Sequence, residues 1–71
     1  MIKIGDKVML SKESEFYGDE EDYTNPMGCV GVVVHVRGNI SWNLPVIVDW
    51  GIEVDGQRVE NSYAQNDLVV V

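Results

Sequence analysis

Basic residues are scarce in this sequence: five Lys and Arg stand against twelve Asp and Glu, which gives a formal net charge of −7. A protein that binds nucleic acid through its phosphates, or that lies on an anionic membrane surface, needs the opposite sign of charge. The composition therefore argues against direct nucleic-acid binding and against membrane binding.

Cysteine and long apolar runs are also scarce. Cys29 is the only cysteine, so no disulfide forms within the chain, as is usual in a reducing compartment. No apolar run approaches the roughly 20 residues of a membrane span, and charges interrupt the opening MIKIGDKV in a way that a signal peptide does not tolerate. These absences predict a cytoplasmic protein.

Residues suited to catalysis or cofactor binding are few. His35 is the only histidine, and on one extended strand it would lie about 20 Å from Cys29, too far for a nucleophile–base pair. The acidic run 19–22 lacks the alternating ligands and the glycine of an EF-hand loop, and Gly28 and Gly31 precede a strand rather than open a helix as in a phosphate-binding loop. We expect no enzymatic activity, no metal site and no cofactor.

The remaining features predict one small all-β domain covering residues 1–71. An apolar fraction of 45% with only two prolines argues against disorder, although a chain of 71 residues can form only a small hydrophobic core. No stretch has helical periodicity, whereas β-branched residues gather in short runs separated by Gly, Asn and Asp. The expected order is a short strand, a long connection, three strands in a meander, a 3₁₀ turn and a short fifth strand.

The apolar runs give the strand positions. The first strand is expected at 7–10, the second at 29–36, the third from Pro45 onward, and the last in LVVV after a 3₁₀ turn within 64–68. Alternation in the second strand would place Val33 and His35 on one face. We expect the opposite face to be buried, with Val30, Val32, Val34 and Val36.

Asp55-Gly56 predicts a two-residue hairpin turn, which fixes the register of the strands on either side. Counting outward from that turn gives the pairs Val54–Gln57, Glu53–Arg58, Ile52–Val59, Trp50–Asn61 and Val48–Tyr63. Opposite charges and apolar side chains then face each other, which supports the register. A bulge at Gly51 would interrupt the count. Trp50 and Tyr63 are expected in the core.

Several short motifs resemble known SH3-like domains. NPMGCVGVV, VIVDWG and NSYAQNDLVVV are similar to the Mind bomb/HERC type of SH3-like domain and to small phage-encoded barrels. The resemblance implies a five-stranded SH3-like barrel with residues 11–28 as its long first loop, and it implies peptide binding beside that loop. The matching positions are Asn25, Pro26, Gly28, Gly31, Val33, Val48, Trp50, Asn61, Tyr63, Asp67 and Leu68. GIEVDGQRVE departs from the family pattern because it lengthens the hairpin after Trp50.

Two other likenesses are weaker. GDKVMLSKES, PVIVDW and the DLVVV ending resemble the small SH3-like stromal subunit of photosystem I, but that family has a shorter first loop and a basic docking surface. The glycines and valines of 28–36 also resemble the KOW pattern of ribosome and transcription proteins, whose RNA role does not suit an acidic chain.

Aromatic and acidic residues supply the candidate binding site. In an SH3-like barrel the long first loop and the loop after the second strand flank one groove, so Trp42 would meet Tyr17 across it. The candidate contacts are Phe16, Tyr17, Asp19, Glu20, Glu21, Asp22, Tyr23 and Trp42, with Asn25, Pro26 and Gly28 shaping the loop. Aromatic rings and carboxylates together favour a segment that carries Lys, Arg or a free amino terminus. Equally, Trp42 would plug the open end of the barrel.

The sequence thus predicts a non-enzymatic module that binds a basic or N-terminal peptide segment of another protein. Two alternatives stay open: an acidic decoy that occupies the basic, nucleic-acid-binding site of a host protein, as suits a phage product, and a small structural subunit docked in a larger complex. A monomer is the default expectation for its oligomeric state.

Overall fold

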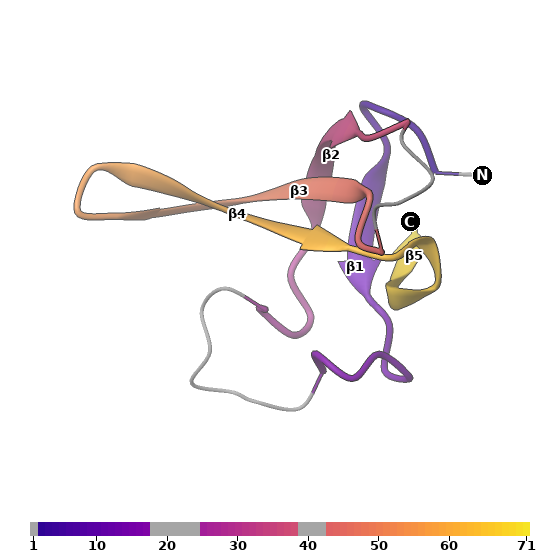
Figure 1. The fold of residues 1–71 in the computed structure, drawn as a ribbon. Coiled ribbons are helices and arrows are strands. Elements are labelled where there is room, and N and C mark those ends of the chain that lie inside the picture. The colour runs from indigo at the N-terminus through magenta and orange to yellow at the C-terminus, as the bar shows by residue number, and fades with distance from the viewer. Residues whose placement is uncertain (1, 18–24, 39–42) are drawn as a thin grey trace.

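The computed structural model describes residues 2–17, 25–38 and 43–71. Five antiparallel strands form one sheet in the order β4-β3-β2-β1-β5, and Figure 1 shows the β3–β4 hairpin extending far from the other strands. The strands are β1 (Lys7–Leu10), β2 (Gly31–Val36), β3 (Val46–Val54), β4 (Gln57–Tyr63) and β5 (Leu68–Val70). A 3₁₀ turn, η1 (Gln65–Asp67), follows β4. The prediction of an all-β chain with this element order is confirmed.

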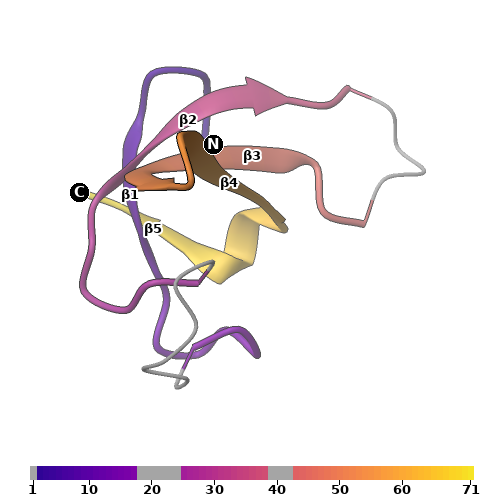
Figure 2. The ribbon, with the colours of Figure 1, turned by 90° about the vertical axis from the view of Figure 1, so that its left-hand side faces the viewer.

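The core lies on one face of the strongly bent sheet, which Figure 2 shows with β2 and β3 side by side. Side chains alternate along the regular parts of the strands. The buried apolar side chains are Ile2, which precedes β1, and the inward-facing Val8, Leu10, Val33, Val46, Val48, Trp50, Val59, Tyr63 and Leu68. Each large apolar side chain that is fully buried contributes about 1.5–3 kcal/mol to folding. Trp50 and Tyr63 lie in this core, as predicted. In the described part of the chain, no helix has the length and hydropathy needed to cross a membrane.

β2 buries the face opposite to the one predicted. Gly31 and Val33 point into the core, whereas Val30, Val32 and Val34 are 50%, 41% and 39% exposed. Gly31 explains the difference: a Cβ there would lie 2.6 Å from Val48 Cγ1, so β2 lies closer to the core side chains of β3 than any other residue permits.

A bulge between Val33 and His35 then changes the alternation along β2. Val36 beyond it packs against the core, as predicted, while His35 is exposed. β2 also begins at Gly31, two positions after the predicted start at Cys29, which is exposed.

The predicted register of the β3–β4 hairpin is confirmed near the turn and wrong farther from it. Asp55 and Gly56 have φ of 52° and 80°, as a turn of this type requires, and the pairs Val54–Gln57 and Glu53–Arg58 form. Farther out, however, Val48 faces Asn61 and Val46 faces Tyr63, so the predicted pairs Trp50–Asn61 and Val48–Tyr63 are wrong.

The cause is a bulge centred on Gly51. Between the pairs Asp49–Glu60 and Glu53–Arg58, β3 holds Trp50, Gly51 and Ile52 where β4 holds only Val59. Gly51 has φ of 73°, a left-handed conformation that costs glycine little, and its N–H donates to Asp49 Oδ1 at 2.8 Å. The predicted Ile52–Val59 pair falls within this bulge and is not among the ladder pairs.

Candidate functional site

The predicted binding residues divide into two groups. Asp19, Glu20, Glu21, Asp22, Tyr23 and Trp42 lie outside the described residues. Phe16, Tyr17, Asn25, Pro26 and Gly28 are described, and they stand at the two ends of the connection that contains the acidic run. The geometry of the candidate site is therefore the geometry of these two ends.

The first end is fastened to η1 through Ser14 and Asp67. The Ser14 hydroxyl donates to Asp67 Oδ1 at 2.9 Å and accepts from the Phe16 N–H at 3.1 Å. The other Asp67 carboxylate oxygen accepts the Ala64 N–H at 3.0 Å. A side chain that is 8% exposed, as Ser14 is, requires such partners, because a buried polar group without them costs free energy.

Phe16 packs this end of the connection against Tyr63 of β4. Its ring lies 5.6 Å from the ring of Tyr63, with an interplanar angle of 80°, and Tyr63 in turn meets Trp50 edge-on at 5.8 Å. Edge-to-face pairs of this kind stabilise by about 0.5–1.5 kcal/mol beyond the area they bury. Tyr17 is half-buried next to Phe16 and packs against the same core.

The second end is fastened to the same tyrosine through Asn25. Asn25 is 8% exposed, and its Oδ1 accepts the Tyr63 hydroxyl at 2.7 Å and Asn61 Nδ2 at 3.0 Å. The Tyr63 oxygen accepts the Trp50 Nε1–H at 3.0 Å. A chain of hydrogen bonds thus runs from the core to the loop end, and no buried side-chain polar atom in the described part of the chain lacks a partner.

Tyr63 therefore contacts both ends of the acidic connection, by its ring at Phe16 and by its hydroxyl at Asn25. We call Ser14, Phe16, Asn25, Tyr63 and Asp67 the loop frame. The sequence predicted that Asn25 shapes the loop and that Tyr63 is buried, but it gave no reason to join them. The only available signal was that a buried tyrosine usually finds a partner for its hydroxyl.

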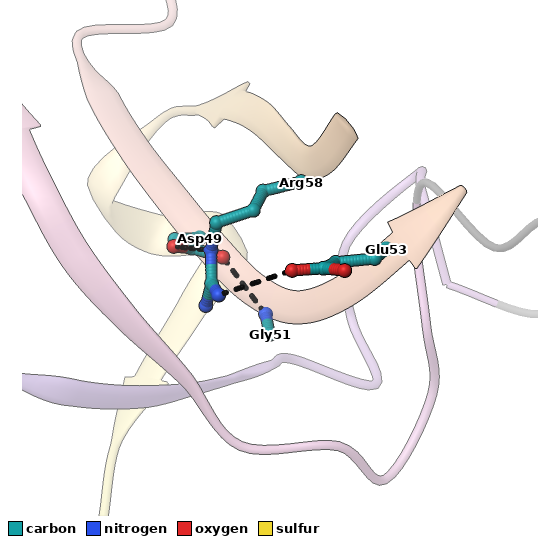
Figure 3. Close-up of polar contacts among 4 residues, drawn as sticks. All are labelled: Asp49, Gly51, Glu53 and Arg58. Atoms are coloured by element: carbon teal, nitrogen blue, oxygen red, sulfur yellow. Dashed lines mark hydrogen bonds and ion pairs between the residues drawn. The ribbon is translucent and has the colours of Figure 1, made fainter. Parts of the chain in front are cut away.

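A second polar cluster lies on the hairpin (Figure 3). Asp49 Oδ2 accepts Arg58 Nε at 2.8 Å, and Arg58 also approaches Glu53 at 4.0 Å. The hydrogen bond from Arg58 is the main cause that lowers the pKa of Asp49, and the bond from the Gly51 N–H lowers it further. The Arg58–Asp49 bond also raises the pKa of Arg58. Asp49 thereby ties β4 to the bulge of β3.

Two shallow hollows lie away from the loop frame. A groove of about 360 Å³ runs along β1 and β5 and is lined by Met9, Leu10, Ser11, Lys12, Glu13, Val69 and Val71. A hollow of about 440 Å³ lies at the hairpin tip, lined by Val54, Asp55, Gln57, Arg58 and Val59. Within residues 2–17, 25–38 and 43–71, no three His, Cys, Asp or Glu side chains are close enough to share a metal ion.

The fold defines the class of this protein as a small all-β domain built on one five-stranded antiparallel sheet. No protein-family model matches the chain, and no curated protein matches it.

Proposed function

We propose that this domain is a non-enzymatic interaction module that binds a basic or N-terminal peptide segment of another protein at the loop frame. The observation that carries the proposal is that Tyr63, a fully buried side chain, contacts both ends of the connection in which Asp19–Asp22 fall. Hydrogen bonds of buried side chains thus hold both described ends of this connection. Loops held by a rigid scaffold in this way commonly carry binding residues.

The described side chains at the frame suit a cationic partner. Phe16 and Tyr17 are only half-buried, and Glu13 and Glu15, which precede them in the chain, are exposed. An ammonium or guanidinium group gains about 0.5–1 kcal/mol from an exposed aromatic face, and nearby carboxylates add attraction over a longer range. A frame that is already ordered also lowers the entropy cost of binding. The resemblance to the Mind bomb type of SH3-like domain supports the same location.

The proposal is tested by NMR titration of the labelled domain with short peptides rich in Lys and Arg, at low and moderate salt. We expect amide shifts at Phe16, Tyr17 and Asn25 that persist when salt is added, because aromatic contacts are screened less than exposed charges. Diffuse shifts that vanish with salt would replace this proposal with the acidic decoy, and no shifts with any peptide would refute it.

Two charge variants locate the contact. Glu20→Gln/Glu21→Gln/Asp22→Asn neutralises three acids of the connection, and Glu53→Gln/Asp55→Asn/Glu60→Gln neutralises three acids of the hairpin as a matched control. We expect the first variant to weaken peptide binding at least tenfold and the second to weaken it less than threefold. Equal losses in both variants would contradict a local site, since they would indicate attraction by net charge alone.

Trp42 separates the two interpretations that the sequence left open. If Trp42 contacts the peptide, Trp42→Ala weakens binding while the melting temperature changes little. If it plugs the barrel, the same change lowers the melting temperature and leaves the affinity of the folded protein unchanged. Peptide titration and thermal unfolding of the same sample measure both quantities.

A further inference from the structure

The outer face of the sheet carries apolar side chains that the core does not use. Val30, Val32, Val69 and Val71 are 41–59% exposed, and Met9 lies among them on β1. Met9 pairs with Val69, and Lys7 pairs with Val32 and accepts the Val71 N–H at 2.9 Å. Directly paired residues share a face of the sheet, so these side chains form one surface across β2, β1 and β5. We call it the valine face: Val30, Val32, Val69, Val71 and Met9.

One row of side chains crosses the whole sheet through the valine face. The pairings give the order Glu60, Asp49, Val32 and Lys7 from β4 to β1. The bond from the Val71 N–H to Lys7 adds Val71, directly after β5, to the end of the row. Two carboxylates therefore lie on one side of Val32, and an ammonium group lies on the other. Neighbouring strands are about 4.8 Å apart, which puts Lys7 and Asp49 roughly 10 Å from each other with Val32 midway.

We propose that the valine face binds a second copy of this chain, face to face, about a two-fold axis close to Val32. A two-fold axis that lies between the two sheets, parallel to the strands at Val32, brings Lys7 of each copy over the Asp49 and Glu60 side of the other, while the valines meet in the centre. A surface that is its own complement is what a two-fold interface requires. This proposal is independent of the loop frame, which lies at Tyr63 on the inward face of β4.

The charges on the valine face favour a second copy of the chain as its partner rather than a basic peptide. Lys7 stands among the side chains of the valine face, paired with Val32, so a cationic segment would meet like charge there. Asp49, in the same row, is already paired with Arg58. Glu60 lies across Val32 from Lys7, and a second copy with the same arrangement reversed would bring a lysine opposite it. The groove of about 360 Å³ continues the surface past Met9, Val69 and Val71.

The valine face consists of only five side chains, which predicts a weak dimer. Apolar patches of a few hundred Å² are common on monomers, and interfaces below about 1,200 Å² in total belong to the transient class. The net charge of −7 on each copy adds long-range repulsion. We therefore expect association in the range of roughly 10–100 µM, which sedimentation over a concentration series detects.

The first test keeps the strand propensity of the mutated positions. Val30→Thr/Val32→Thr/Val69→Thr replaces valine with an isosteric β-branched residue on the valine face, and Val54→Thr is the control, at 37% exposure on the hairpin. We expect the triple variant to dissociate at least ten times more readily and the control to behave as the parent. Thermal unfolding verifies that both variants are folded. A parent chain that is monomeric at 1 mM, or a triple variant that dimerises as the parent does, overturns the proposal.

A charge exchange tests the orientation. Glu60 is the better acid to change, because Asp49 is already bonded to Arg58 and to the Gly51 N–H. Lys7→Glu alone and Glu60→Lys alone each set like charges opposite across the axis, so each should weaken its own dimer at least fivefold. An equal mixture restores both attractive pairs and should form the mixed dimer at parental strength. If the mixture associates no better than the single variants, the proposed packing is wrong.

Discussion

Tyr63→Phe is the sharpest test of the loop frame, because it removes one oxygen atom and leaves the ring. In the folded protein that oxygen accepts the Trp50 Nε1–H at 3.0 Å and donates to Asn25 Oδ1 at 2.7 Å. The ring contacts with Phe16 and Trp50 remain possible in the variant. Any loss of stability therefore reports the hydrogen bonds.

The expected loss follows from what is left without a partner. Trp50 is 4% exposed, so its indole N–H would stay buried and unpaired, at a cost of about 1–3 kcal/mol. Asn25 Oδ1 would keep its bond from Asn61 Nδ2 and lose less. We expect a total loss of about 2–3 kcal/mol, a large share of the 5–15 kcal/mol typical of a folded domain.

Urea unfolding followed by tryptophan fluorescence measures this loss, with Tyr17→Phe as the control. The Tyr17 ring is half-buried, and its hydroxyl makes no hydrogen bond within the described part of the chain. We expect the unfolding midpoint of Tyr63→Phe to fall by about 2 M urea and its melting temperature by roughly 10–20 °C, while Tyr17→Phe changes little.

The loop frame also predicts coupling between Tyr63 and Asn25. In a double-mutant cycle with Asn25→Ala, the two changes should be non-additive by about 0.5–3 kcal/mol, as expected for residues in one network. Equal stabilities for the two phenylalanine variants, or strict additivity in the cycle, would refute the argument that these bonds hold the second loop end.

Two further predictions concern β3 and its neighbours. Gly31→Ala should cost about 1–3 kcal/mol, because the new Cβ would lie 2.6 Å from Val48 Cγ1, whereas Gly38→Ala, with no atom within 4 Å, should cost almost nothing in the same urea assay. For Asp49→Asn we expect a loss of stability that depends on pH. The pKa of Asp49 in the folded protein lies below its ordinary value of 3.8, so its carboxylate stabilises the fold above that pH and ceases to do so as the pH falls through the lowered pKa. The difference between parent and Asp49→Asn should therefore be present at pH 7 and shrink as the pH falls below 3.8 and through the lowered pKa, and a difference that stays constant with pH would contradict it.

The element order was predictable from the sequence because it depends on local signals. Runs of β-branched residues, the Asp55-Gly56 turn and the polar 3₁₀ segment each act within a few residues, and the structure confirms all three. The bulge at Gly51 was harder, since a glycine permits a positive φ without requiring one. What enforces it is the bond from the Gly51 N–H to Asp49, whose carboxylate is also held by Arg58 across the hairpin.

The sequence predicts a binding site in the long connection from its aromatic and acidic residues, and that site stays a prediction. The contacts that hold the ends of the connection were not predictable. The partners of Ser14 and Asn25 come from 53 and 38 positions away, at Asp67 and Tyr63. No local pattern encodes a contact over such a separation, because the fold alone brings the residues together.

The burial of β2 shows how one residue without a side chain decides a surface. Alternation in 29–36 offers two faces, and counting valines favours the one with Val30, Val32 and Val34, since it buries more apolar area. That count assumes that every inward position carries a side chain. Gly31 faces the core without one, and the side chains of Val48 and Trp50 occupy the space that its Cβ would need. The valines are thereby turned outward beside Lys7 and Asp49, and the same glycine that closes the core creates the face on which we propose that two copies meet.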